Sequence, residues 1–299
     1  MILRNYPESI TELQNNFIIH FTTNKTELDK HISPLSLKCL MKGREEYGTN
    51  EGRYTVTPGT YLIVNEGQEC SSSISSESET FSVYFDQGFA NDVLQSLVTP
   101  GDKFLNYSFM PGNLPVQFLE KLYSHDNSIS PLIMKLRLAS KFNFDNECFI
   151  KETFYELLEK LLFVHRELYK EIDKLPPLKL STKTELYKRV CRAKEYIDSS
   201  FTEDLTLEKL AKEACLSRFH FLRLFKTIYH KTPHRYLTEK RIEKAVSLLF
   251  TTDMSITEIC FEIGFGSLSS FSWLFRNKFG LSPGMTREHY RRHISSIKL

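Results

Sequence analysis

Residues 217–233 read SRFHFLRLFKTIYHKTP, and residues 267–283 read SLSSFSWLFRNKFGLSP. Both stretches carry aromatic and aliphatic residues at the same spacing, and both end in a hydroxyl residue followed by proline. At an offset of 50, the matching pairs are Phe221 and Phe271, Leu224 and Leu274, Phe225 and Phe275, Lys226 and Arg276, Thr232 and Ser282, and Pro233 and Pro283. Shorter helical patterns at 207–214 and 256–263 precede them with an offset of 49. A short helix, a tight turn and a second helix, written twice, predict two helix-turn-helix units of the kind that enters a DNA major groove.

The buried face of each second helix determines which residues point outward. The expected core positions are Phe221, Leu224, Phe225 and Ile228 in the first copy and Phe271, Leu274, Phe275 and Phe279 in the second. The candidate DNA-contacting residues on and beside the opposite faces are Ser217, Arg218, Phe219, His220, Leu222, Arg223, Lys226, Ser267, Ser269, Ser272, Trp273 and Arg276. One such helix pair alone would equally be an ordinary helical hairpin, but a second copy with a basic bias favours nucleic-acid binding. Burial of Trp273 against a neighbouring helix and a surface His220 without a role remain the alternatives for those two residues.

The charges are unevenly divided along the chain. Residues 184–299 contain 20 Lys and Arg against 13 Asp and Glu, whereas residues 1–183 contain 19 against 24. A basic carboxyl-terminal part suits a polyanion, and the acidic remainder does not. The length of 299 residues and the hydrophobic content of 41% are typical of two globular domains.

The cysteines and the amino-terminal residues indicate the cellular compartment in which the protein is expected. The six cysteines form no C-x-x-C pair and no cluster with histidines, which is typical of reduced thiols in a cytosolic protein. The amino terminus lacks the basic start and apolar core of a signal peptide, and no apolar run approaches the ~20 residues of a membrane span. We therefore expect a cytoplasmic protein without a membrane partner.

Alternating apolar residues between about Leu35 and Phe85 predict β-structure. The expected strands lie at 35–41, 54–56, 61–64 and 81–85, with another passing through Ile74, and Gly and Pro turns separate them. This pattern is typical of an antiparallel barrel or sandwich. The run from Lys42-Gly43 to Gly67 looks like a cupin-type barrel, but the H-x-H-x₃₋₄-E type cluster of metal-binding cupins is absent, and His20 and His31 are isolated. We expect no metal, no cofactor and no enzyme activity.

A seam of apolar residues follows in a helical region. Its members step by four and three residues and are Ile150, Phe154, Leu157, Leu161, Val164 and Leu168. This is the spacing of a coiled-coil seam, and it fits either contact with a second subunit or packing onto the barrel of the same chain. The Leu175-Pro176-Pro177-Leu178 stretch after it predicts an interdomain linker.

The second helix-turn-helix pattern resembles the AraC/XylS transcription regulators. The residues that carry the resemblance are Ile259, Cys260, Gly264, Phe265, Ser269, Phe271, Leu274, Phe275, Arg276, Gly280, Ser282 and Pro283. The match covers about residues 184–292, and the first 170 residues resemble the family's effector domain only in layout. The resemblance implies that Phe219, Leu222 and Arg223 in the first helix, and Ser269, Ser272 and Trp273 in the second, occupy base-contacting positions. Trp273 departs from the Arg often found there.

These observations lead to one set of expectations for the whole chain. We expect an α+β protein with a cupin-like effector-binding and dimerisation domain at 1–172, a linker at 173–183 and a double helix-turn-helix domain at 184–299. The expected function is a DNA-binding transcription regulator, with an activator that responds to a ligand as the favoured form. Its expected partners are double-stranded DNA, a second copy of the chain, a small-molecule effector and RNA polymerase.

Two other functions stay open, and the effector residues are candidates only. The chain could be a cupin-type enzyme with an accessory DNA-binding module, or a constitutive DNA-binding dimer without an effector. The candidate effector-contacting residues are Tyr47, Arg53, Tyr61 and Tyr84, although residues of these types also occur in barrel cores and on surfaces.

Overall fold

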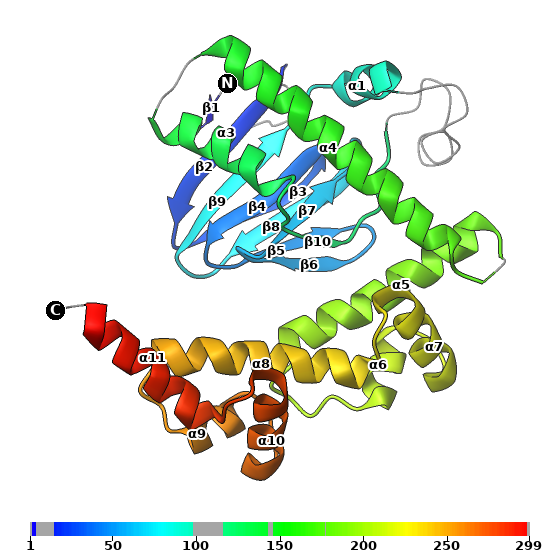
Figure 1. Ribbon diagram of the computed structural model, residues 1–299. Coiled ribbons are helices and arrows are strands. Elements are labelled where there is room, and N and C mark those ends of the chain that lie inside the picture. Colours follow the sequence, from blue (N-terminus) through cyan, green and yellow to red (C-terminus); the bar gives the residue numbers. More distant parts are fainter. Residues whose placement is uncertain (1, 4–14, 98–115, 143–145, 177, 298–299) are drawn as a thin grey trace. The chain divides into compact units, whose positions relative to one another are not determined.

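The computed structural model describes residues 2–3, 15–97, 116–142, 146–176 and 178–297. The chain divides into two compact units, Met1–Lys174 and Leu175–Leu299 (Figure 1). The predicted linker falls at this division, and its Pro177 lies outside the described residues.

Unit 1 contains two sheets. The six-stranded sheet has the order β1-β2-β9-β4-β7-β10, and the four-stranded sheet has the order β3-β8-β5-β6. All described neighbours pair antiparallel except β1 and β2. The strands are β1 Ile2–Leu3, β2 Phe17–Thr23, β3 Thr26–Ser33, β4 Ser36–Lys42, β5 Glu45–Thr49, β6 Arg53–Val56, β7 Thr60–Val64, β8 Gln68–Ile74, β9 Ser78–Tyr84 and β10 Leu122–Ser124.

The predicted strands are confirmed as β4, β6, β7, β8 and β9, but β1, β2, β3, β5 and β10 were missed. β2 begins with four successive buried residues, so its apolar residues form a run and do not alternate. A run buried on both faces has no period of two by which to recognise a strand. β3 is mostly exposed and polar, and its register on β8 shifts between Leu28 and His31.

The inner face of the six-stranded sheet meets the four-stranded sheet. Leu40, Leu62 and Val64 pack there with residues of the other sheet, Tyr47, Tyr54, Val56 and Cys70. Phe17, Ile19 and Tyr84 form a second inner cluster. The unit therefore has the layout of a barrel built from two sheets around a common interior.

Helices cover the outer face of the six-stranded sheet. Figure 1 shows α3 and α4 lying across it. The helices of unit 1 in its described part are α1 Phe89–Leu97, α3 Ser130–Phe142 and α4 Glu147–Asp173. The ring of Phe85 after β9 meets Phe154 of α4 edge-on at 5.9 Å between centroids. α4 thus completes the core of its own unit.

This packing decides between the two interpretations of the apolar seam. Phe154, Leu157, Leu161 and Leu168 are 1%, 0%, 2% and 8% exposed within the single chain. These four side chains have no surface left for a second subunit, so the prediction that they form a dimer contact is corrected to internal packing. Ile150 and Val164, the other two seam residues, are partly exposed.

A polar cluster connects β2 and β9 to α3. Glu79 accepts hydrogen bonds from Arg137 at 2.7 and 3.0 Å and lies 3.0 Å from the Nε2 atom of His20. The Nδ1 atom of His20 lies 2.9 Å from the hydroxyl of Ser140. Burial raises the pKa of Glu79, but the hydrogen bonds from His20 and Arg137 outweigh it and lower the pKa overall. We call this set the Glu79 cluster.

Unit 2 is entirely helical in its described part. Its helices are α5 Leu180–Ser200, α6 Leu207–Glu213, α7 Arg218–Tyr229, α8 Pro233–Thr251, α9 Ile256–Glu262, α10 Leu268–Phe279 and α11 Pro283–Ile297. Within the unit, Figure 1 shows α8 running from the α6–α7 pair to the α9–α10 pair. The predicted division into two helix-turn-helix units joined by a long helix is confirmed.

The helix boundaries follow the hydroxyl residues that precede them. Thr206, Ser217, Thr232, Ser255 and Ser267 each accept a hydrogen bond from a backbone amide of the helix that follows. Such caps satisfy amide groups that the first turn of a helix leaves without partners. The starts of these helices are therefore local properties of the sequence.

The two turns contain equivalent backbone conformations. Cys215 in the first turn and Gly264 in the second both have positive φ, 51° and 85°. They are 49 residues apart, whereas the capping residues Ser217 and Ser267 are 50 apart. The extra residue of the second turn therefore lies after Gly264, next to Phe265.

Candidate nucleic-acid interface and ligand-binding barrel

The outward face of α7 carries the residues expected to contact DNA. Phe221, Leu224 and Phe225 are fully buried on one side of the helix. On the other side Arg218, Phe219, Arg223 and Lys226 are exposed, and Phe219 is 78% exposed. Leu222 and His220 are partly exposed, and Ser217 caps the helix through the backbone amide of His220. The structure therefore places all seven candidate residues of the first copy on one accessible end and face.

The three basic side chains of this face differ in how they are held. Arg218 forms an ion pair of 2.5 Å with Glu208 of α6. In the described part of the chain, the side chains of Arg223 and Lys226 have neither ion pairs nor hydrogen bonds. An uncompensated guanidinium on an accessible helix is available to a base edge or a phosphate.

α10 presents a different set of groups. Trp273 is 64% exposed, so the alternative that it is buried within this unit does not hold. Ser269 and Arg276 are exposed, Ser272 is partly exposed, and Ser267 caps the helix. Phe271 and Phe275 are fully buried as predicted, but Phe279 is 44% exposed. The predicted core position of Phe279 is wrong because the helix ends there, at Gly280 in the left-handed region.

A residue that sequence reasoning missed holds the two motifs together. Arg241 of α8 donates two hydrogen bonds of 2.7 Å to the carbonyl oxygens of Phe201 and Glu203, which lie between α5 and α6. Its guanidinium also lies 5.7 Å from the ring of Phe265 in the second turn. Arg241 thus joins the segment that leads into the first helix-turn-helix unit to the turn of the second. No local pattern marks it, because its partners lie 40 and 38 residues away.

The four candidate effector residues divide into two pairs. Tyr47 and Tyr84 are 2% and 0% exposed and belong to the inner clusters of the barrel. Tyr61 is equally buried but lies on the outer face, where its ring stacks on Tyr123 at 5.3 Å. Arg53 is exposed on β6. Tyr61 and Arg53 therefore do not face the interior with Tyr47 and Tyr84, because successive strand residues face opposite sides of a sheet, and contact of any of the four with an effector stays a prediction.

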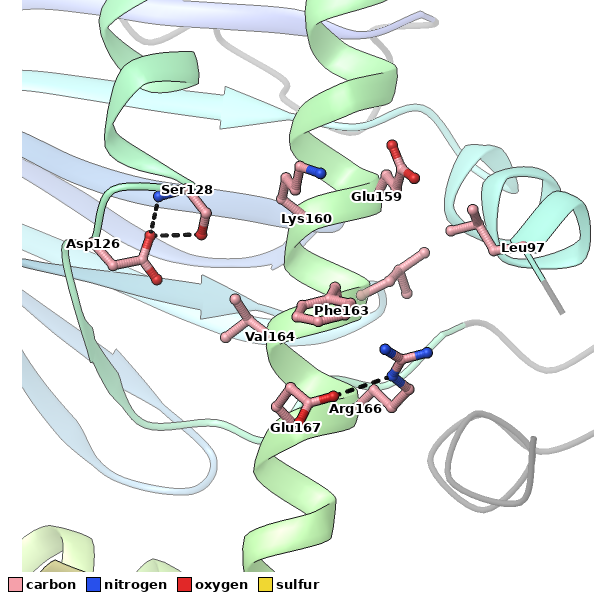
Figure 2. A pocket seen from close by; sticks show the side chains of 10 residues that line it. Leu97, Asp126, Ser128, Glu159, Lys160, Phe163, Val164, Arg166 and Glu167 are labelled. Carbon is pink, nitrogen blue, oxygen red and sulfur yellow. Dashed lines mark hydrogen bonds and ion pairs between the residues drawn. The ribbon is translucent and has the colours of Figure 1, made fainter.

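A pocket on the outer side of unit 1 lies beside α4. Figure 2 shows Phe163, Arg166 and Glu167 of α4 facing it, with Leu97 at the end of α1 on the other side. Two pairs of its polar groups already contact each other: Arg166 lies 3.4 Å from Glu167, and Asp126 accepts hydrogen bonds from the amide and hydroxyl of Ser128.

In the described ranges, no three His, Cys, Asp or Glu side chains come together in a way that could hold a metal ion. Over the same ranges, none of the helices has the length and apolar character to cross a bilayer.

Two family models match the chain. A model described as an AraC-like ligand binding domain matches residues 29–158, and a helix-turn-helix domain model matches residues 210–289. The first covers most of the barrel of unit 1. The second covers both reading helices, the name that we use for α7 and α10.

Several curated proteins are similar to the carboxyl-terminal part. The regulator AlkR of Acinetobacter baylyi is 40% identical over 87 residues, which are 29% of this chain and 27% of AlkR. The transcriptional activator VirF of Yersinia enterocolitica is 33% identical over 96 residues, 32% of this chain and 35% of VirF. The regulatory protein SoxS of Salmonella typhimurium is 32% identical over 89 residues, 30% of this chain and 83% of SoxS. The chain thus spans about a third of the length of the first two relatives and most of SoxS.

Solved structures are also similar to the chain. The DNA-binding domain of AdpA in complex with a target DNA is 30% identical, with a TM-score of 0.34, and the match covers 35% of this chain and 94% of that one. ToxT from Vibrio cholerae is 14% identical, with a TM-score of 0.37, over 91% of this chain and 94% of ToxT. With the double helix-turn-helix geometry, the two family models and the coverage of SoxS in place, this chain belongs to the AraC/XylS family of transcription regulators.

Proposed function

We propose that the chain is a sequence-specific DNA-binding regulator of transcription whose two reading helices enter successive major grooves, and whose barrel binds a small-molecule effector. One observation supports the DNA-binding part most directly. Two equivalent helices of one compact unit expose Arg223, Lys226 and Arg276, and none of these side chains has a partner in the described structure. The relatives that the chain matches are regulators, which favours this function over a cupin-type enzyme.

The two reading helices are expected to discriminate bases unequally. Arg223 can make a bidentate contact with guanine, and Phe219 and Leu222 beside it can contact thymine methyl groups. Arg218 must first leave Glu208, so we assign it to a phosphate. Trp273 has a single donor on its indole and cannot make a bidentate contact. We therefore expect α7 to carry most of the base selectivity and α10 to contribute shape recognition, with Arg276 on phosphate.

Two further partners are RNA polymerase and a second copy of the chain. An activator contacts RNA polymerase, and similarity to VirF, which is named a transcriptional activator, favours this form. We also propose a homodimer. Its interface must use surface outside Phe154, Leu157, Leu161 and Leu168, because these side chains are buried in their own unit. Sedimentation velocity of the full chain over a range of concentrations tests the dimer.

The test of DNA binding uses sites selected by the full chain from random duplexes. Protection should extend over two major grooves on one face of the duplex, roughly 34 Å apart. Arg223→Ala should relax selectivity at one base pair and cost about 1–3 kcal/mol, which is roughly 5-fold to 150-fold in affinity. Lys244→Ala, on an exposed position of α8 outside both reading helices, is the charge-matched control. Protection of a single groove, or equal effects of the two variants, would contradict the proposal.

Trp273 provides a separate test of α10. It is the chain's single tryptophan, so its fluorescence reports on that helix alone. We expect a spectral change when selected DNA binds. If the fluorescence is unchanged and Trp273→Ala leaves sequence preference intact, Trp273 does not read the DNA.

A further inference from the structure

The interior of the barrel contains a buried ammonium group. Lys38 on β4 is 1% exposed, and its Nζ atom donates a hydrogen bond of 2.6 Å to the hydroxyl of Tyr84. The same atom lies 3.9 Å from the centroid of the Tyr84 ring. An ammonium has three N–H donors and no acceptor. Among the described residues, Lys38 makes this one hydrogen bond, so two donors are left for an acceptor oxygen.

Other polar groups face the same interior without partners. Ser82 lies on β9 directly opposite Lys38 of β4. Ser72 lies on β8 of the other sheet, directly opposite Tyr47 of β5. The hydroxyl oxygens of Ser72 and Ser82 are buried, and no hydrogen-bond partner for either occurs in the described part of the chain. Buried polar groups in proteins are almost always hydrogen-bonded, so such a set indicates that a bound species supplies the partners.

His31 adds an acceptor of known orientation. Its Nδ1 atom lies 3.0 Å from the carbonyl oxygen of Asp29, so in the neutral ring Nδ1 carries the hydrogen and Nε2 bears a lone pair. Nε2 is buried and has no partner among the described residues. Burial lowers the pKa of His31 despite the bond to Asp29, and the charge of Lys38 lowers it further, so the ring is neutral near pH 7. His31 sits opposite Cys70, one of the inner residues.

The charges of the interior limit what can bind. Burial lowers the pKa of Lys38 to about 8, which leaves most of the ammonium protonated near pH 7. Glu45 is also fully buried and accepts a hydrogen bond of 2.9 Å from Thr80. Its charge interacts favourably with that of the Lys38 ammonium. A singly charged oxyanion can accept hydrogen bonds from the two remaining N–H groups of Lys38. A dianion would be repelled more strongly by Glu45.

We propose that Lys38 binds the carboxylate of a small monoanionic ligand between the two sheets of the barrel, with Ser72, Ser82 and the Nε2 atom of His31 as further hydrogen-bonding positions. This inference rests on the proposed function, because it names the chemical class of the effector. The competing explanation for the same unpartnered groups is a set of ordered water molecules. A ligand and water differ in whether a dissolved carboxylate stabilises the barrel.

The experiment uses the full chain and matched pairs of compounds. Sodium butyrate, lactate and 3-hydroxybutyrate are each compared with the corresponding primary amide at constant ionic strength, by differential scanning calorimetry and isothermal titration. The amide keeps the size and a neutral oxygen but lacks the charge. We expect at least one carboxylate to raise the melting temperature of unit 1, while its amide and sodium chloride do not.

Two variants assign the effect to the interior. Lys38→Met keeps the length and apolar stem of the side chain, and replacing a buried charge by an apolar residue often leaves a protein as stable. It should bind the carboxylate at least tenfold more weakly. Lys42→Met removes a 60% exposed lysine of the same strand and should bind as the wild type does. If Lys38→Met does not fold, Ser82→Ala replaces it, with a smaller loss expected.

The outcomes separate this inference from the proposed function. If no carboxylate stabilises the chain more than its amide, or if Lys38→Met responds as the wild type does, water fills the site and the inference is overturned. The same samples are assayed for binding to selected DNA. DNA binding without a carboxylate effect refutes the inference alone, whereas a carboxylate effect without DNA binding supports the site and refutes the regulator.

Discussion

Arg241 tests whether the two helix-turn-helix units depend on each other. We replace it with methionine, which retains the apolar stem and removes both hydrogen bonds to the carbonyl oxygens of Phe201 and Glu203. A hydrogen bond from a charged donor contributes about 1.5–3 kcal/mol. Arg241 is only partly buried, so we take the low end for each bond and expect a loss of about 3 kcal/mol.

This free energy should be visible in both stability and DNA binding. For a unit of this size, a loss of about 3 kcal/mol lowers the melting temperature by roughly 10 °C. If the two motifs are no longer held in place, part of the DNA-binding free energy is used to order them, and the same loss weakens binding by tenfold or more. Calorimetry of the full chain measures the first effect, and the transition that DNA raises identifies unit 2. Titration with DNA carrying both half-sites measures the second.

Arg235→Met is the matched control on the same helix. Arg235 pairs with Glu239 at 3.0 Å, but its side chain is 72% exposed, and exposed pairs contribute about 0–1 kcal/mol. We expect a small change in melting temperature for this variant. Equal melting temperatures and equal DNA affinities for the two variants would refute the view that Arg241 joins the motifs.

Three further predictions concern the cores and the pH dependence. Leu157→Asp should abolish the melting transition of unit 1, because it places a charge in a fully buried site; a folded monomer in sedimentation would instead restore the dimer interpretation of the seam. Gly264→Ala should destabilise unit 2 more than Gly280→Ala in calorimetry. Both have positive φ, which costs alanine about 1–2 kcal/mol, but only at Gly264 would the new Cβ meet a backbone oxygen, at 2.4 Å. Because the folded pKa of Glu79 is lowered from 4.5, its stabilising effect is present above that pH and is lost as the pH falls through the folded value; Glu79→Gln should remove this part of the acid dependence, and an unchanged acid profile would contradict it.

Much of unit 2 could be predicted because its determinants are local. Hydroxyl caps such as Ser255 satisfy amides within one turn, and the i, i+3, i+4 spacing around Phe221 and Phe271 defines a buried face. Once that face is known, Arg223 and Trp273 have to point outward. Repetition of the same pattern then removed the alternative of a single helical hairpin.

Periodicity identified the seam on α4 but not its partner. An apolar stripe indicates that one face of the helix is buried. The free energy of burying it is the same whether the covering surface belongs to the same chain or to another. Only the tertiary structure shows that Leu157 and Leu161 face the core of their own unit. The same limit applies to Tyr61, whose burial was foreseeable but whose side of the sheet was not.

The sequence by itself determined the repeated helix-turn-helix units, their caps, their outward faces and half of the described strands, because these depend on residues within a few positions of one another. The tertiary structure decided what no local pattern contains. Arg241 bonds to residues about 40 positions away, and Lys38 is buried because strands β4, β9 and β8 meet around it. From the sequence, a charged residue in a strand of alternating polarity is expected to be exposed. Only the position of the opposite sheet shows that Lys38 is buried. Long-range contacts therefore assign both the coupling of the motifs and the polar interior of the barrel.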